Sequence, residues 1–229
     1  MFVALDIFAE RGYACGPPDH SIRSKERMLY TVQKGDIVRA GKVLSDAFQR
    51  DPLWNKIFEG ESDLEKRLHA IFEVSVRYCL KYGEVCAPSG DLEGVIGLVP
   101  GKYADMNIWR TILSGSMGSA MRIGFNAAKK MAPVFKPVNE DRHKHMAGHT
   151  FLHLSIVGVA TELQGKGFGR KLIDAAIEKS EREGLYLYLE TETEENMKMY
   201  EHFGFGLLKR ITLPIVDLPL WEMARKPKV

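Results

Sequence analysis

The segment with the clearest chemical meaning in this sequence is the glycine-rich stretch of residues 164–169, Gln-Gly-Lys-Gly-Phe-Gly. Its three glycines allow the backbone to approach a ligand closely. A buried-looking strand over residues 152–159 precedes it, and an amphipathic helix follows it. A helix start offers unpaired N–H groups and the positive end of the helix dipole, which together attract anions. The segment therefore predicts a phosphate site between a strand and a helix.

The spacing of the glycines distinguishes this loop from two common nucleotide-binding loops. A dinucleotide-binding fingerprint needs two residues between its second and third glycines, whereas Gly165, Gly167 and Gly169 alternate. The phosphate loop of NTPases needs a lysine followed by Ser or Thr, whereas Lys171 is followed by Leu172. The loop therefore belongs to another class of anion site.

The loop resembles the Gln/Arg-x-x-Gly-x-Gly/Ala pyrophosphate loop of the GNAT superfamily of acyl-CoA-dependent N-acetyltransferases, with Gln164, Gly167 and Gly169 at the specified positions. Residues 185–205 are similar to the family's Leu-Glu-Thr…Asn…Tyr…Gly-Phe motif, which spans a strand and a short helix. The C-terminal third most resembles the branch that contains the puromycin N-acetyltransferases. The N-terminal half matches that branch only in the order of its elements, so the antibiotic is not carried over.

This resemblance implies an α/β fold (α+β by some schemes), namely a GNAT domain whose mixed central sheet has helices on both sides and is splayed at the strand before the glycine loop. Hydrophobic patterns predict helices over residues 36–48 and 64–82, and strands over residues 29–32, 84–87, 93–99 and 220–225. We expect a single domain over residues 30–229, with a helical insertion at about residues 101–149 that includes a helical stretch over 108–132. Residues 1–29 are expected to form a weakly ordered N-terminal appendage or a short docked helix.

The resemblance also implies where acetyl-CoA, the cosubstrate, binds. The backbone at the end of the strand before the loop would pair with the pantetheine arm and the thioester carbonyl, and the loop amides would hold the pyrophosphate. The expected cofactor-binding residues are Val157, Gly158, Val159, Gln164, Gly165, Lys166, Gly167, Phe168, Gly169, Arg170 and Asn196. The alternatives are a solvated helix start for the two basic side chains and a structural helix position for Asn196.

Strict alternation along the strand before the loop predicts which side chains share a face. One face would carry His153, Ser155, Val157 and Val159, and the other Leu154, Ile156 and Gly158. We expect one of these two faces to line the cofactor cleft.

Tyr200 is the candidate general acid, because the resemblance places it where the family's tyrosine hydroxyl faces the CoA sulfur. A tyrosine with a pKa of about 10 can protonate a thiolate whose thiol has a pKa of about 8.5. Glu190 is the candidate general base, since it ends the polar-bearing face of its strand. The alternatives are a core aromatic role for Tyr200, a structural role for Glu190 and proton removal through water, with His153 and Ser155 as reserve bases.

Composition limits the remaining function classes. The 229 residues are 45% hydrophobic and 27% charged, as is ordinary for one globular domain. The 32 basic and 30 acidic residues nearly balance, which argues against nucleic acid or a membrane surface as a partner. The three cysteines show no C-x-x-C spacing and no apolar run is long enough to span a bilayer, so we expect a cytoplasmic protein with reduced thiols.

No metal site is expected. His143, His145, His149 and His153 lie close in sequence, but their spacing fits neither a zinc finger nor a His-Glu-x-x-His helix. The resemblance implies direct, metal-free acetyl transfer from acetyl-CoA to a primary amine, and we expect the acceptor to be a small molecule. The alternatives are a catalytically silent acyl-CoA-binding regulator and an acetyltransferase of protein N-termini or lysines, and a homodimer is left open.

Overall fold

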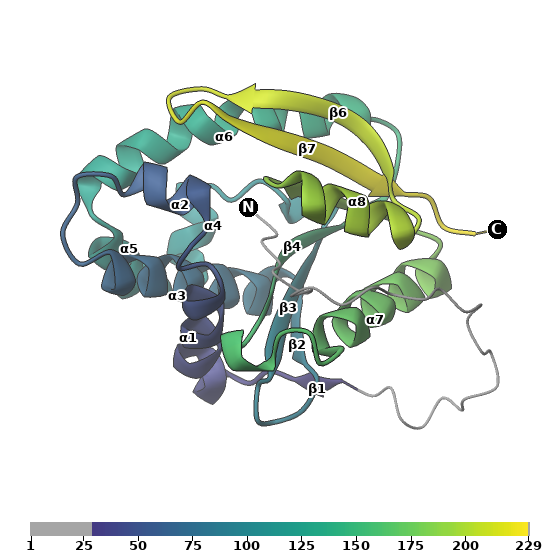
Figure 1. The fold of residues 1–229 in the computed structure, drawn as a ribbon, viewed down its shortest axis with the longest axis horizontal. Coiled ribbons are helices and arrows are strands. Elements are labelled where there is room, and N and C mark those ends of the chain that lie inside the picture. Colours follow the sequence, from purple (N-terminus) through teal and green to yellow (C-terminus); the bar gives the residue numbers. More distant parts are fainter. Residues whose placement is uncertain (1–28, 229) are drawn as a thin grey trace.

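A computed structural model describes residues 29–228, so the appendage expected before them lies outside the described residues. They form a seven-stranded sheet with the strand order β1-β2-β3-β4-β5-β7-β6 (Figure 1). Neighbouring strands are antiparallel except β4 and β5, which are parallel. The strands are β1 Tyr30–Thr31, β2 Glu84–Ala87, β3 Gly94–Pro100, β4 Phe151–Val159, β5 Tyr186–Thr191, β6 Gly206–Leu213 and β7 Leu218–Arg225. This mixed sheet with flanking helices confirms the predicted fold class.

Helices cover both faces of the sheet. On one face α1 (Ile37–Ala47) and α3 (Leu64–Tyr82) pack against β3 and β4, and on the other α7 (Phe168–Glu183) packs against β3, β4 and β5. The helix α8 (Glu194–His202) follows β5 on the α7 side (Figure 1). The other helices are α2 Pro52–Ile57, α4 Ile108–Leu113, α5 Met117–Ile123 and α6 Phe125–His145, with 3-10 turns η1 Lys34–Asp36, η2 Gly101–Tyr103 and η3 Thr161–Leu163.

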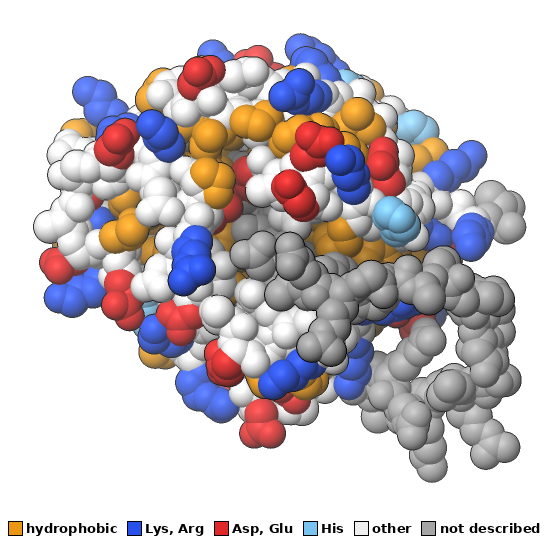
Figure 2. All heavy atoms as spheres, viewed as in Figure 1, with side chains coloured by type: hydrophobic (Ala, Val, Ile, Leu, Met, Phe, Trp, Pro, Cys, Tyr) orange, Lys and Arg blue, Asp and Glu red, His pale blue; other side chains and the backbone are white. Residues whose placement is uncertain are grey.

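Surface charge and helix length are two further features of the described residues. On the face shown in Figure 2, basic and acidic side chains are interspersed, so no large field of one sign forms there. Within residues 29–228, every helix is too short or too polar to cross a bilayer.

The sheet separates two apolar clusters that hold β4 from both sides. Leu44 of α1 and Phe72 of α3 pack in the same cluster as Ile156 of β4. Leu172 of α7 packs in the second cluster with Val157 of β4. Burying one such side chain contributes about 1.5–3 kcal/mol, so β4 is fixed by packing before any ligand is considered.

The helix α6 extends further than the sequence predicted. Its residues Pro133 and Pro137 lie inside the helix. Because proline lacks an N–H and disfavours helical geometry in the residue before it, the sequence pattern ends at residue 132. Pro133 is exposed and Pro137 partly exposed, so water can satisfy the carbonyls that lose a partner. The extension matters because it carries Asn139, Arg142 and His143 toward the sheet.

The short helix α2 was also missed, although its start signal is clear in the structure. The Asp51 carboxylate accepts hydrogen bonds from the N–H groups of Leu53 and Trp54, each at 3.0 Å, and Pro52 occupies the first helical position. The Asp-Pro pair that ends the pattern of α1 therefore also starts α2. This turn fixes the positions of Asp51 and Trp54.

Candidate functional site

The strands β4 and β5 lie side by side only over their first residues. Phe151 pairs with Tyr186, and the pairing ends where His153 meets Tyr188. Beyond that point β4 continues along β3 to Val159, whereas β5 stays paired with β7. Within the described chain, no strand pairs with the β5-facing edge of β4 after His153. The sheet is therefore splayed at the strand before the glycine loop, as predicted.

A bulge in β4 changes the side-chain directions predicted there. Gly97 and Leu98, neighbours on β3, pair with Ile156 and Leu154, so Ser155 has no opposite residue. The prediction of strict alternation is therefore wrong between Ser155 and Ile156, because the extra residue exchanges the two faces for residues 156–159. Ile156 and Gly158 face α1 and α3. Leu154, Val157 and Val159 face α7.

The glycine loop connects η3 to α7 and leaves backbone amides free. Gly165 and Gly167 have φ angles of +74° and +88°, in the left-handed region that glycine adopts readily. Because α7 begins at Phe168, its first N–H groups have no acceptor within the helix. Among the described residues, the N–H groups of residues 167–170 donate to no acceptor. A Cβ on Gly165 or Gly167 would meet no atom within 4 Å, so the loop has both free donors and the room that an anion requires.

The side chains of this loop leave the free amides accessible. Gln164 turns back, with its Nε2 3.4 Å from the Val159 carbonyl oxygen. Lys166 and Arg170 are exposed, and Arg170 Nε lies 3.7 Å from Asp174 Oδ2. Both basic groups are thus on the surface near the loop, where either could reach a bound anion.

The helix α8 carries the two residues predicted from the second motif. Thr193 caps it, and its hydroxyl oxygen accepts the Asn196 N–H at 3.2 Å. Tyr200 lies one turn later and is fully buried against Phe205, with ring centroids 5.4 Å apart. Its hydroxyl has no hydrogen-bond partner among the described residues. Burial raises the pKa of Tyr200 well above its ordinary value, so the phenol keeps its proton at neutral pH.

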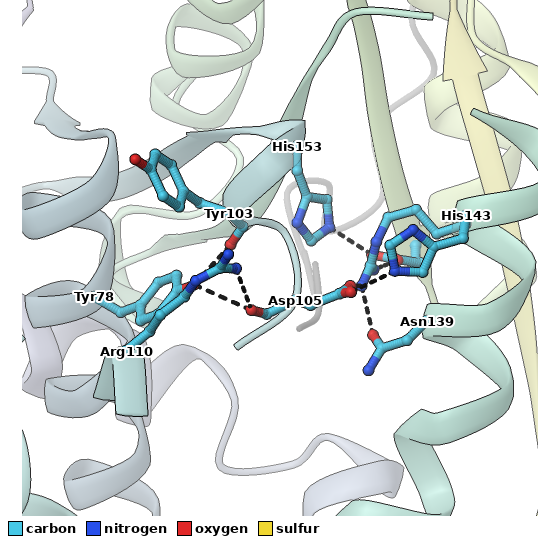
Figure 3. Close-up of polar contacts among 9 residues, drawn as sticks. Tyr78, Tyr103, Asp105, Arg110, Asn139, His143 and His153 are labelled. Atoms are coloured by element: carbon cyan, nitrogen blue, oxygen red, sulfur yellow. Dashed lines mark hydrogen bonds and ion pairs between the residues drawn. The ribbon is translucent and has the colours of Figure 1, made fainter. Parts of the chain in front are cut away.

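Glu190 lies in a buried network of charged side chains that joins β4, β5 and α6. Its Oε2 is 2.7 Å from His153 Nε2, and its Oε1 accepts from the Arg142 guanidinium. Arg142 is 2% exposed and also donates to Asp105 Oδ1 at 2.6 Å. Figure 3 shows the side chains of Asp105 and His143 meeting beside α6, with 2.5 Å between Oδ2 and Nε2.

This network sets the protonation states of its members. Burial alone would raise the pKa of Glu190, but the contacts with His153 and Arg142 outweigh it and hold that pKa well below its usual range. Burial lowers the pKa of His153 to about 4, so its ring is neutral at pH 7. The proton must then sit on Nε2, because an ionised Glu190 can only accept. A carboxylate neutralised by arginine is a weak base, and this geometry favours the structural alternative for Glu190.

Removing Arg142 is expected to destabilise the protein. Arg142→Met leaves the buried Glu190 carboxylate without its cation, which typically costs about 3–5 kcal/mol. Denaturant unfolding followed by circular dichroism measures this change. Lys144→Met is the control on the same helix, with a 72% exposed side chain, and should cost less than about 1 kcal/mol. Equal losses in the two variants would show that the network does not stabilise the fold.

Two carboxylates near the parted strands were not predicted. Glu192 directly follows β5, is 4% exposed, and neither of its carboxylate oxygens has a hydrogen-bond partner among the described residues. Burial and the nearby Asp51 charge raise the pKa of Glu192 well above its ordinary value, and burial raises that of Asp51 to about 6. The Glu192 charge also raises the pKa of Tyr200, although burial is the larger cause. The three groups therefore share one region, and the alternation that selected Glu190 would also have selected Glu192, two residues on.

Three of the four histidines predicted not to form a metal site contact different carboxylates, and the His149 ring packs 4.6 Å from the Tyr186 ring. His143 and His153 meet Asp105 and Glu190, as described above, and His145 Nδ1 is 2.9 Å from Glu222 Oε2. Across residues 29–228 there is no group of three or more His, Cys, Asp and Glu side chains that could hold a metal ion.

Comparisons with known proteins agree with this geometry. A model described as acetyltransferase (GNAT) family matches residues 127–205, which include the parted strands, the glycine loop and α8. An uncharacterized N-acetyltransferase of Schizosaccharomyces pombe is 32% identical over 206 residues, covering 86% of this chain and 82% of that protein.

Solved structures share the fold at low sequence identity. A Corynebacterium glutamicum structure described as histone acetyltransferase HPA2 and related acetyltransferase has a TM-score of 0.61 at 16% identity, over 88% of this chain and 96% of that chain. Arylalkylamine N-acetyltransferase 2 of Aedes aegypti has a TM-score of 0.56 at 18% identity, over 88% of this chain and 99% of that chain.

Proposed function

This chain belongs to the GNAT family of N-acetyltransferases, and from that premise we propose that it transfers an acetyl group from acetyl-CoA directly to a primary amine of a small-molecule acceptor. The family generally uses acetyl-CoA. The observation that supports this proposal most is that a parted pair of strands leads into a loop with free amides and open space before it. A cytoplasmic location stays a prediction of the sequence.

The residues expected to hold acetyl-CoA fit that role. When bound, this cosubstrate supplies an acetyl group activated as a thioester. The N–H groups of residues 167–170 would hold the pyrophosphate, with charge from Lys166 or Arg170. The β4 edge over residues 157–159, which β5 leaves unpaired, would bind the pantetheine arm by backbone hydrogen bonds. Asn196 would assist from α8.

Tyr200 suits the role of general acid. A tyrosine hydroxyl is protonated at neutral pH, and burial, which raises the pKa of Tyr200, keeps it so. A buried hydroxyl without a partner costs about 1–3 kcal/mol, and that cost is relieved if a ligand atom becomes the partner. The Tyr200 hydroxyl would then donate its proton to the departing thiolate.

Of the two glutamates at the end of β5, the geometry favours Glu192 over Glu190 as the general base. Glu190 is held by Arg142 and His153, which stabilise its ionised form. Glu192 has no such partner among the described residues, and its raised pKa makes it a better acceptor for the ammonium proton of the acceptor. Glu190 would then act by holding Arg142 and His153 in place.

Replacing Glu192 by glutamine should remove this proton acceptor without changing size. We expect Glu192→Gln to lower kcat by up to about a hundredfold and to flatten the acid side of its pH profile, since the rate falls where the wild-type carboxylate becomes protonated. Glu194→Gln, at an exposed position of α8, is the control. An unchanged pH profile of kcat in Glu192→Gln would exclude it as the base.

The proposed function is tested by two measurements on the whole chain. Thiol release from acetyl-CoA is followed across a panel of amines, and coenzyme A binding is measured by calorimetry. Amine-dependent thiol release supports the proposal. Binding without turnover of any amine would instead support a catalytically silent regulator, and the absence of binding would refute the assigned loop.

A further inference from the structure

A cavity of about 530 Å³ lies between α3 and α6. Trp54 of α2, together with Ala104 and Met106 after η2, completes its walls. Its volume falls within the roughly 300–1,000 Å³ of pockets that receive small organic ligands. None of the residues predicted from the sequence as catalytic or cofactor-binding lines it.

The inner lining of this cavity is apolar apart from Ser75 of α3, whose hydroxyl donates to the Ile71 carbonyl oxygen at 3.0 Å. Trp54, Ile71 and Val74 are at most 5% exposed, and Met131 and Phe135 of α6 lie partly buried beside them. The rings of Trp54 and Phe135 form an aromatic corner, with centroids 6.4 Å apart. Polar side chains gather on the α6 side of the lining, namely Lys136, Asn139, Glu140 and His143. Such a lining binds apolar groups by excluding water from both surfaces.

The polar side of the cavity adjoins the charged network at the parted strands. Asn139 and His143 line the cavity, and they contact Arg142 and Asp105 at 2.5 Å each. Arg142 in turn contacts Glu190 at the end of β5. On the other side of the cavity, Trp54 belongs to the helix capped by Asp51, the carboxylate whose charge acts on Glu192. The cavity and the proposed reaction site are therefore neighbours.

The cavity and the glycine loop lie on opposite faces of the sheet. Ile71 and Val74 of α3 belong to the same apolar cluster as Ile156 of β4. The helix that starts at the glycine loop packs with Val157 and Val159 on the other face. A cosubstrate held by the loop would thus reach the parted strands from one side and leave the cavity for the second reactant.

We propose that this cavity receives the apolar group of the acceptor, so that the acceptor is a primary amine borne on an alkyl or aryl group. This inference rests on the proposed function and adds the chemical class of its second substrate. The amine would lie where the cavity adjoins the parted strands, and the alkyl or aryl group would lie among Ile71, Val74 and Phe135.

The charge distribution disfavours a diamine or polyamine in the same position. A second ammonium would lie inside the apolar lining, where burying an unpaired charge is strongly unfavourable. The Asp105 carboxylate, which contacts the lining residue His143, is already paired with Arg142 as well. Glu140 is exposed at the α6 side of the lining and leaves the interior uncharged.

Amines of matched shape test this assignment. Heptylamine and 1,6-diaminohexane have equal numbers of non-hydrogen atoms and differ by a terminal methyl against a second ammonium. We expect kcat/KM with acetyl-CoA to be at least tenfold higher for heptylamine. Along propylamine, pentylamine and heptylamine, kcat/KM should rise by up to about fourfold for each buried methylene.

A matched pair of variants assigns the effect to the cavity. Ala132→Phe fills the cavity from an exposed position of α6, and we expect it to raise KM for heptylamine at least tenfold while leaving propylamine and coenzyme A affinity unchanged. Ala128→Phe adds the same side chain at an exposed position one turn earlier, outside the lining, and should behave like wild type.

The outcomes separate this inference from the proposed function. A flat amine series, a preference for the diamine, or a rate that instead rises with acyl chain length from acetyl-CoA to hexanoyl-CoA would overturn the inference and leave acyl transfer intact. If no amine is turned over, calorimetric titration of heptylamine and 1,6-diaminohexane into the protein still decides it. Binding of heptylamine that Ala132→Phe removes supports the cavity assignment, and equal or absent binding of both amines overturns it.

Discussion

Gly167→Asp is expected to abolish coenzyme A binding while the fold survives. The substitution places a carboxylate among the free N–H groups at the start of α7, where the phosphates would bind. A like charge at about 4 Å costs up to about 4 kcal/mol near a protein surface, so we expect affinity to fall by about a hundredfold or more. Isothermal titration with coenzyme A measures the loss, and circular dichroism checks the fold.

The control for this variant is Gly167→Asn. Asparagine has nearly the same shape as aspartate and tolerates the positive φ of this position about as well, so it carries the same backbone cost without the charge. Asparagine should therefore retain much of the affinity that aspartate loses. Wild-type affinity in Gly167→Asp would refute the assigned phosphate site.

Tyr200→Phe is expected to lower turnover by about one to three orders of magnitude with little change in coenzyme A affinity. The variant removes only the hydroxyl, which is the proposed proton donor, and such assistance contributes within this range. Stability should not fall, because the hydroxyl has no hydrogen-bond partner among the described residues and its loss leaves no other group unpaired. Steady-state thiol release gives kcat, and thermal unfolding gives the stability.

Tyr186→Phe provides the comparison for Tyr200. It removes a tyrosine hydroxyl from β5 at a partly exposed position away from α8. Its turnover should match wild type. If Tyr200→Phe were equally active, Tyr200 would have no part in the chemistry and its core aromatic role would be the correct interpretation.

The elements with a clear apolar period could be predicted from the sequence. The helix α3 and the strand β2 have the predicted bounds, because α3 carries an apolar stripe over five turns and β2 precedes a turn-rich link. The strand β6 was missed because it is exposed over most of its length, so it shows no alternation of apolar and polar residues.

Membership of the GNAT family is confirmed, and the closer relation to the puromycin enzymes stays a prediction.

The site could be predicted only where local motifs define it. The glycine loop was predicted from its glycine spacing, and Tyr200 from the resemblance of its segment to a family motif, and the roles of both stay predictions. The bulge at Ser155 depends on how β4 pairs with β3, and the contact between Arg142 and Glu190 joins residues 48 positions apart, so neither leaves a local signal. The cavity between α3 and α6 likewise forms only when these two helices pack together.

The ion pair between Arg142 and Glu190 has a consequence for engineering this protein. Residues 101–149 could look like a cassette to be exchanged for the corresponding segment of another enzyme in order to change acceptor preference. Yet that segment supplies the cation that neutralises a fully buried carboxylate of the central sheet. A chimera would have to bring its own arginine to this position, or replace Glu190 at the same time, to keep the stability of the original fold.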